Sequence, residues 1–316
     1  MAENRNIYKK SALIRTQIAR DLYLAKVGEK IPGIQEYAEK LSVSRGIIQQ
    51  ALEAVTEDKS VAIEKRGVKG SYLVAAEYKK LYAHTGWGAV TGTMPIPLNP
   101  YFTSLATAVC EELKQSEIPF SFAYISGSQK RVEALKNEVC DFMILTKSAA
   151  RLHMAEHDDL EICAEMKNAR YSPEYVLYFT DPDKYQVEDG MRVAIDRACM
   201  DQKALTEHIC KDKNVEFVEF PFIGFRDVIK EGNVDCLVYR KLDWIDDDKV
   251  SDSIGVHAVA LEKIDGFDLE AITTPVVLVR KANYGIDRLL KKCFDPQKIC
   301  EIQKQVLEGN RSMRIY

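Results

Sequence analysis

Two apolar stripes separated by a short polar turn constrain this chain more than any other feature of its sequence. Apolar side chains recur at the spacing of one helix face in two groups: Ile34, Tyr37, Ala38 and Leu41, then Ile47, Ile48, Ala51, Leu52 and Val55. Ser42-Val43-Ser44 separates the groups, and we expect the Ser44 hydroxyl to cap the second helix by accepting a free backbone N–H. Two helices joined by such a turn form a helix-turn-helix, whose second helix enters the DNA major groove.

The outward-facing residues at the start of the second helix suit contact with base edges. They are Ser44, Arg45, Gly46, Gln49 and Gln50. Arginine reads guanine and glutamine reads adenine through paired hydrogen bonds. A helical hairpin with a solvated outer face, inside a domain of another function, explains the same residues. The neighbouring sequence has to decide between the two interpretations.

A basic hairpin after the helix pair favours DNA binding. Residues 61–64 and 71–75 have strand patterns, and the turn between them carries two glycines. In this turn, Lys65, Arg66, Gly67 and Lys69 suit contact with phosphate or with the minor groove. An earlier stripe predicts a first helix that ends near Lys26. Three helices and a basic hairpin make a winged helix-turn-helix, which we assign to residues 1–75.

The charge of the chain is divided between its two parts. Residues 1–80 hold 15 Lys+Arg against 10 Asp+Glu, a net charge of +5, whereas the rest carries −9 and the whole chain −4. A basic head on an acidic body is the asymmetry expected when only one end of a protein meets phosphate. The sequence therefore predicts a double-stranded DNA operator as the partner of the head alone.

Residues 13–74 resemble the DNA-binding domain of the GntR family of bacterial transcription regulators. The resemblance is carried by Gly28-Glu-Lys-Ile-Pro32, Tyr37-Ala38, Leu41-Ser-Val-Ser-Arg45, Gln49-Gln-Ala-Leu52, Arg66-Gly67 and Gly70. In that family a Ser/Thr-Arg pair opens the recognition helix and its arginine touches DNA, which implies these roles for Ser44 and Arg45. Two further family positions are usually arginine, but here they are Gln35 and Gln49. The usual threonine pair is Gly46-Ile47, so the operator sequence stays open.

From residue 86 onward, strand and helix patterns alternate, which predicts an α/β body with parallel sheets covered by helices on both faces. Residues 135–141 and 229–235 echo each other, because each runs from a helix end through an aspartate into an apolar strand. Two such lobes resemble the type 2 periplasmic-binding-protein fold. We place lobe I at about 86–180 and 258–316, lobe II at about 181–257, and a linker at 76–85.

The combination of this head with this body, opened by Thr91-Gly-Thr-Met-Pro95, resembles the YhfZ-like regulators. The resemblance implies that the body senses a small-molecule effector, and it implies no particular ligand. In such folds a ligand lies between the lobes, at the carboxyl ends of strands. The candidate ligand-binding residues are Gly92, Thr93, Ser126, Gly127, Ser128, Thr146, Lys147, Asp196, Arg197, Tyr239 and Arg240.

Ser126-Gly127-Ser128 is the most informative of these candidates. Free backbone N–H groups at a helix start, together with two hydroxyls, favour a carboxylate or a phosphate, so we expect a small anionic effector. A serine that merely caps the helix is the alternative. For Arg197 and Arg240, a surface ion pair is the alternative to a role in ligand binding.

The remaining patterns do not indicate a cofactor or a metal. His153 and His157 lie four residues apart, but the sequence offers no third ligand nearby. The eight cysteines are widely spaced and contain no C-x-x-C, which is typical of buried thiols in a reducing compartment. Residues 1–20 are basic and contain no apolar segment, so we expect no signal peptide and no membrane partner. We expect the protein to be cytoplasmic.

The sequence thus predicts a transcription regulator rather than an enzyme. The head is expected to bind DNA as a homodimer on a two-fold site, and the body to change operator affinity when it binds its effector. The alternative is an enzyme whose α/β body acts on a small molecule and whose helical head serves only for dimerisation. The charge of the head and the presence of Arg45 favour the regulator.

Overall fold

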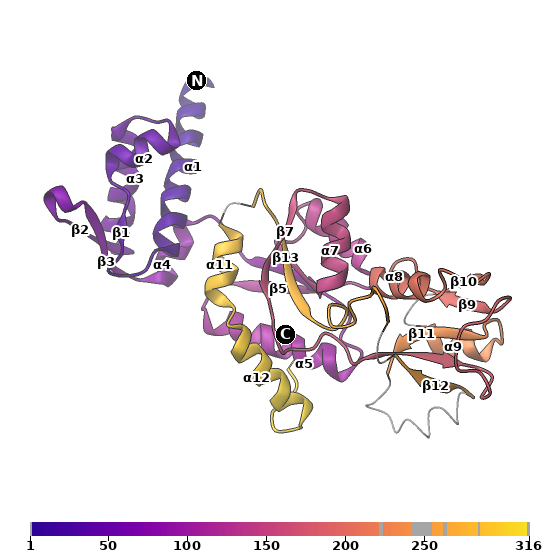
Figure 1. The fold of residues 1–316 in the computed structure, drawn as a ribbon. Helices are drawn as coiled ribbons and strands as arrows, with labels where there is room; N and C mark the ends of the chain where they lie inside the picture. The colour runs from indigo at the N-terminus through magenta and orange to yellow at the C-terminus, as the bar shows by residue number, and fades with distance from the viewer. Residues whose placement is uncertain (1, 221–223, 242–254, 262–263, 284, 315–316) are drawn as a thin grey trace. The chain divides into compact units, whose positions relative to one another are not determined.

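The computed structural model describes residues 2–220, 224–241, 255–261, 264–283 and 285–314. Two compact units divide the chain: Met1–Val90 with Lys114–Phe120, and Thr91–Leu113 with Ser121–Tyr316. The first unit contains the helix-turn-helix, and the second contains two five-stranded sheets (Figure 1).

The first unit packs four helices against a small antiparallel sheet (Figure 1). Its helices are α1 (Ala2–Leu24), α2 (Ile34–Leu41), α3 (Arg45–Glu57) and α4 (Tyr78–His84). Its strands are β1 (Lys30–Ile31), β2 (Val61–Lys65) and β3 (Ser71–Ala76), in the order β1-β3-β2. Residues 42–44 form the turn between α2 and α3, as predicted, and β2 and β3 form the predicted hairpin.

The apolar stripes form the core of this unit. Tyr37, Ile48 and Val55 of the two stripes are fully buried, and so are Ile18 and Leu22 of α1. Burying a side chain of this size stabilises a fold by roughly 1.5–3 kcal/mol. Helix α1 begins at Ala2, well before the first apolar residue of its predicted stripe.

The segment predicted as a linker, residues 76–85, contains α4 and packs on α1. The ring of Tyr23 makes edge contacts with the rings of Tyr78, Tyr82 and Trp87, at centroid distances of 5.5, 5.6 and 5.7 Å. The guanidinium of Arg20 lies over the Trp87 ring. Four aromatic rings and a cation therefore hold residues 76–87 against α1.

The second unit is built on two mixed sheets. The first has the order β5-β4-β6-β13-β7, with β4 (Val90–Met94), β5 (Phe120–Tyr124), β6 (Phe142–Thr146), β7 (Leu160–Glu165) and β13 (Pro275–Arg280). The second has the order β10-β9-β11-β8-β12, with β8 (Tyr175–Phe179), β9 (Arg192–Ile195), β10 (Glu216–Glu219), β11 (Cys236–Arg240) and β12 (His257–Ala260).

The prediction of parallel sheets is wrong for half of the neighbouring strand pairs in each sheet. Strands β4 and β6 pair in parallel, as do β9 with both β10 and β11. However, β13 is antiparallel to β6 and β7, and β8 is antiparallel to β11 and β12. The alternating pattern missed this because β8 follows β7 of the first sheet and β13 follows β12 of the second, so neither strand is reached through a crossover helix from a strand of its own sheet. Strands β8 and β12 flank residues 181–257 in the sequence, and both belong to the second sheet. This sheet therefore extends beyond the predicted bounds of lobe II.

Helices cover both faces of the first sheet. The main helices of the unit are α5 (Pro100–Gln115), α6 (Ser128–Lys136), α7 (Lys147–Glu156), α8 (Met200–Ile209), α9 (Phe225–Lys230), α11 (Ile286–Cys293) and α12 (Pro296–Leu307). On β6, Met143 and Leu145 pack into a cluster with Val132 of α6, whereas Phe142 contacts the ring of Phe294, next to α11. Adjacent residues of the strand thus face different helices.

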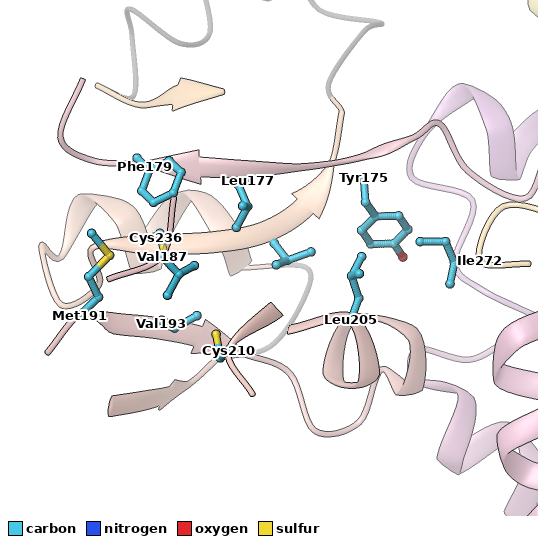
Figure 2. Close-up of a cluster of buried hydrophobic side chains, with 11 residues drawn as sticks. Tyr175, Leu177, Phe179, Val187, Met191, Val193, Leu205, Cys210, Cys236 and Ile272 are labelled. Atoms are coloured by element: carbon cyan, nitrogen blue, oxygen red, sulfur yellow. The ribbon is translucent and has the colours of Figure 1, made fainter. Parts of the chain in front are cut away.

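The second sheet has its own core, shown in Figure 2. Phe179, Val193 and Cys236 come from three neighbouring strands and are completely buried. Tyr175 lies at one end of this cluster beside Leu205 and Ile272 (Figure 2). The same tyrosine also lines the cavity described below, so the core of the sheet continues into the wall of the cavity.

Two further properties of the described residues concern the class of protein. None of the described helices is both long enough and apolar enough to cross a membrane. All eight cysteines are free thiols, and six of them are buried. Burial raises the pKa of Cys163, Cys199 and Cys236 to about 12, which keeps these thiols protonated and unreactive at neutral pH.

Candidate functional site

The start of α3 exposes the residues that were predicted to meet DNA. Ser44 occupies the N-cap position in extended conformation, but its side chain makes no capping hydrogen bond. The prediction of a capping hydroxyl is therefore wrong in its chemistry, although right in its position. Ser44, Arg45 and Gln49 are all exposed. An exposed hydroxyl that does not cap its helix stays available to an outside acceptor such as a phosphate.

A short hydrogen-bond chain fixes the side chain of Arg45. Its Nε–H donates to the Oε1 atom of Gln35 on α2, and the amide of Gln35 donates in turn to Glu39. Within the part of the chain that the structure describes, the two terminal nitrogens of Arg45 make no hydrogen bond. These are the nitrogens that recognise guanine in a paired contact. Gln35 thus positions Arg45 from the neighbouring helix.

Gln49 and the hairpin tip complete the exposed basic surface. The Gln49 amide donates to Glu53 one helical turn further on, at 2.9 Å. At the hairpin, the guanidinium of Arg66 bonds Glu64 at 2.7 Å and lies over the Tyr72 ring at 4.4 Å. Arg66 is therefore partly neutralised within the hairpin, whereas Lys65, Gly67 and Lys69 are exposed at the tip.

A second site lies in the body, where residues of both sheets line a cavity of about 80 Å³. The walls come from the loop after β4, the start of α6, the segment before β8, the start of α8 and the end of β11. The lining residues are Pro95, Ile96, Leu98, Phe102, Ser126, Gly127, Ser128, Arg131, Leu145, Ala149, Tyr171, Ser172, Tyr175, Asp196, Cys199, Asp201 and Arg240.

The predicted Ser126-Gly127-Ser128 turn forms part of this wall. Gly127 adopts a φ of 80°, and a Cβ atom there would lie 3.3 Å from the backbone oxygen of Ala198 in the second lobe. Both its backbone conformation and the close approach of the lobes favour glycine. Because Gly127 is the N-cap of α6, no side chain caps this helix. Ser128 is 6% exposed, and its Oγ has no hydrogen-bond partner among the described residues.

Arg131, one turn further along α6, is buried against the same cavity. It is 3% exposed. Its Nη1 donates to the Ile125 carbonyl at 2.9 Å and its Nη2 to the Tyr171 hydroxyl at 3.2 Å. Among the described residues, its Nε–H has no hydrogen-bond partner. A buried guanidinium with an unused donor favours an anionic ligand.

A buried hydrogen bond joins the two lobes next to the cavity. The Thr146 hydroxyl, which caps α7, donates to Oδ2 of Asp201 on α8 at 2.6 Å. Burial raises the pKa of Asp201 to about 6, although hydrogen bonds from Thr146 and Ser148 and the charge of Arg131 oppose the shift. Thr146 itself is not among the residues that line the cavity.

The end of β11 contributes the second arginine of the cavity. Arg240 is 8% exposed and its guanidinium lies over the Phe102 ring at 4.7 Å. Phe102 belongs to α5, so this contact also joins the two lobes. Cation–π contacts gain strength when the charged group is desolvated, and Arg240 is largely buried. Tyr239, the preceding residue, points instead into the core of the second sheet.

The structure separates Gly92, Thr93, Lys147 and Arg197 from the cavity. Gly92 lies inside β4, where an added Cβ would lie 2.4 Å from the Phe142 ring, and Thr93 is buried beside it. The strand runs on to Met94, so Gly92 and Thr93 lie within the strand and not beyond its end. Lys147 pairs with Glu165 at 2.9 Å, and Arg197 pairs with Glu219 on the surface. Asp196 does line the cavity, although its Oδ1 accepts from the Ala198 N–H.

Sequence reasoning missed several residues of the wall, notably Arg131, Ser172 and Asp201. Arg131 had a signal, since it lies three residues after Ser128 and so on the same face of a predicted helix. Asp201 lies in the first turn of α8, but nothing local marked it as buried. Ser172 follows a loop without a pattern, and only the fold brings it to the cavity.

His153, the first histidine of the pair considered for a metal, points into the protein. It is fully buried, and neither ring nitrogen has a hydrogen-bond partner among the described residues. Burial lowers its pKa to about 4. His157 instead contacts the Lys136 amine at 3.0 Å. No group of three or more potential metal ligands occurs in the described ranges.

The head and the body together define a helix-turn-helix protein with a two-lobed α/β domain. A helix-turn-helix domain profile matches residues 26–73, and the YhfZ C-terminal domain profile matches residues 77–314. The chain therefore belongs to the YhfZ family.

Three known proteins are similar to this chain, and two of them are YhfZ proteins. The uncharacterized protein YhfZ of Escherichia coli K12 is 28% identical over 307 residues, which is 97% of this chain and 98% of that protein. The crystal structure of YhfZ from Shigella flexneri matches with 25% identity and a TM-score of 0.63, over 75% of this chain and 97% of that one. An ancestral arginine-binding protein bound to arginine matches with 16% identity and a TM-score of 0.46, over 71% of this chain and 94% of that one.

Proposed function

We propose that this chain is a transcription regulator in which a winged helix-turn-helix of GntR type binds an operator and a type 2 periplasmic-binding-like body binds a small anionic effector. The observation that carries the proposal is the start of α3, where Arg45 is exposed and held by Gln35. A side chain that is ordered before binding loses less entropy when it meets a base.

The chemistry of the head supports contact with a duplex. Arg45 and Gln49 supply the side chains that read base edges, and Ser44 supplies a hydroxyl for a phosphate. The hairpin tip adds Lys65 and Lys69, which neutralise phosphates without reading sequence. Arg66 contributes less, because it already pairs with Glu64.

The body supports ligand sensing because its cavity, with buried arginines and serines in the wall, lies between two lobes. A ligand that contacts both lobes favours their closed arrangement, and a change of arrangement in a homodimer alters how two heads fit a two-fold operator. The alternative function, an enzyme with a dimerising head, lacks an activated thiol at this cavity. Cys199 lines it, but burial raises its pKa to about 12.

Fluorescence anisotropy with labelled duplexes from the DNA upstream of the gene tests the proposal. Arg45→Ala should weaken binding by about 1–3 kcal/mol, on the order of 10- to 100-fold, if Arg45 reads a guanine. Arg151→Ala, which removes an exposed arginine of the body, should leave the affinity unchanged and serves as the matched control. Equal affinities for wild type and Arg45→Ala would contradict the proposal.

A further inference from the structure

The cavity of the body contains more buried hydrogen-bond donors than the protein itself satisfies. Ser128 Oγ, Ser172 Oγ and Arg131 Nε lack partners among the described residues, and these three residues are 6%, 1% and 3% exposed. Buried polar groups are almost always hydrogen-bonded in folded proteins. Three such groups on the wall of one cavity therefore indicate a molecule that supplies the acceptors.

The unsatisfied groups select a negatively charged partner. The Nε–H of Arg131 can only donate, and both serine hydroxyls can donate as well. Two other bonds hold the guanidinium in place, from Nη1 to Ile125 and from Nη2 to Tyr171, so its Nε edge is preset. A planar carboxylate matches such an edge.

The acidic residues of the wall do not cancel this preference. Asp201 accepts a hydrogen bond from Thr146 through Oδ2, whereas its Oδ1 has no partner among the described residues, and Asp196 accepts one from the backbone of Ala198. Their acceptor capacity is thus partly used within the protein. Their charges disfavour a dianion, because a second negative charge on the ligand would face two carboxylates.

The size and the remaining walls of the cavity limit the ligand further. Since a water needs about 10–15 Å³ of such space, the volume of 80 Å³ holds roughly five to eight non-hydrogen atoms. Ile96, Phe102 and Leu145 form an apolar part of the wall. A phosphate has no apolar group to place there, whereas a short carboxylic acid has one.

From these observations we infer that the cavity binds a short-chain monocarboxylate, with its carboxylate on Arg131, Ser128 and Ser172 and its carbon chain against Phe102 and Ile96. The inference rests on the proposed function only in that the body is a ligand-binding domain. It specifies the class of effector, which the proposed function leaves at a small anion.

Isothermal titration calorimetry on the full chain tests the inference. The probes are propionate, lactate and 2-oxobutyrate, each of which fits the volume, with propionamide and lactamide as neutral controls and inorganic phosphate and succinate as competing anions. At least one monocarboxylate should bind saturably and more tightly than phosphate and succinate, and the amides should not bind. The inference is overturned if no monocarboxylate binds, or if phosphate or succinate binds more tightly than all three.

Variants assign the binding to this cavity. Arg131→Gln should weaken the best monocarboxylate by about 10- to 100-fold, because a charged hydrogen-bond donor is lost. Arg151→Gln, on the exposed side of α7, should bind like wild type. The double variant Ser128→Ala/Ser172→Ala removes two hydroxyls with little change in volume and should also weaken binding several-fold, which covers the case that Arg131→Gln does not fold. Wild-type affinity in either folded variant overturns the assignment.

The same samples separate this inference from the proposed function. If a monocarboxylate binds in the cavity but the chain has no affinity for upstream duplexes, the ligand class stands and the regulator proposal fails. If the chain binds DNA in an Arg45-dependent manner but no monocarboxylate, the ligand class fails and the head keeps its proposed role.

Discussion

The head exposes the side chains proposed to act, whereas the body buries them. Arg45 is exposed and is held by one exposed neighbour, Gln35. Arg131 is 3% exposed and is held by a backbone carbonyl and a buried tyrosine. A surface that meets a duplex can be built from one helix and one hairpin, because phosphates and bases come to it. A cavity for a small molecule needs walls from several distant segments.

The largest expected effect is a loss of stability that is confined to the head. Ile48 is fully buried in the head, so Ile48→Ala should destabilise it by about 2–5 kcal/mol. We expect duplex binding to be lost at temperatures where the body still binds its ligand. Calorimetric unfolding of the variant, with ligand binding measured in parallel, checks this. Simultaneous loss of both activities would mean that the two regions fold as one unit.

The second prediction concerns two buried groups of the body with opposite pKa shifts. The folded-state pKa of His153 is lowered from 6.5 to about 4, so between these values only the unfolded chain takes up the proton and stability falls as the pH falls. The pKa of Asp201 is raised from 3.8 to about 6, so in that range the folded chain holds the proton and stability rises as the pH falls. Each contribution amounts to up to about 3 kcal/mol.

These contributions oppose each other in the wild type, so variants are needed to reveal them. Asp201→Asn should lose stability more steeply than wild type on acidification from pH 7, because the His153 contribution is then no longer opposed by that of Asp201. His153→Gln should lose it less steeply. Urea unfolding across this pH range measures the slopes, and equal slopes in all three proteins would contradict the burial argument.

Most of the head followed from its sequence, and much less of the body did. The two apolar stripes, which contain Tyr37 and Ile48, were predicted together with the turn at residues 42–44 and the hairpin, because helical spacing, turn length and glycine positions are local properties. The strands of the body were also recognised locally. Their order and direction in the sheets were not recognised, because β8 and β13 pair antiparallel with strands that are distant in the sequence.

The candidate residues show the same division. Ser44 and Arg45 are exposed where the pattern put them, while Gly92, Thr93, Thr146, Lys147, Arg197 and Tyr239 do not line the cavity. Their positions were taken from strand ends, and a shift of one residue along a strand moves a side chain to the other face. Whether the lining residues bind a ligand stays a prediction.

A smaller effect is expected at the tip of the hairpin. Lys69→Ala removes one exposed cation, and it should lower the magnitude of the slope of log affinity against log salt by about one unit, with little change in sequence preference. Arg66→Ala should change the slope less, since Arg66 is already paired with Glu64. Anisotropy titrations at several salt concentrations compare the two variants. A larger change for Arg66 would contradict the assignment of the tip.

The smallest effect compares a helix start in each region. Ser44 does not cap α3 through its side chain, so Ser44→Ala should change the stability of the head by less than about 0.5 kcal/mol. Asp295 caps α12 through the N–H groups of Gln297 and Lys298, and Asp295→Ala should cost the body about 1 kcal/mol. Chemical unfolding measures both. Equal costs would show that the Ser44 hydroxyl caps its helix after all.

The most direct test of the central claim is the affinity of the full chain for an upstream duplex, measured between about 50 and 200 mM salt. The account predicts that affinity falls steeply as salt rises, and that Arg45→Ala weakens binding throughout this range. A flat salt dependence, or the absence of any measurable affinity, would contradict the proposal that the head binds DNA.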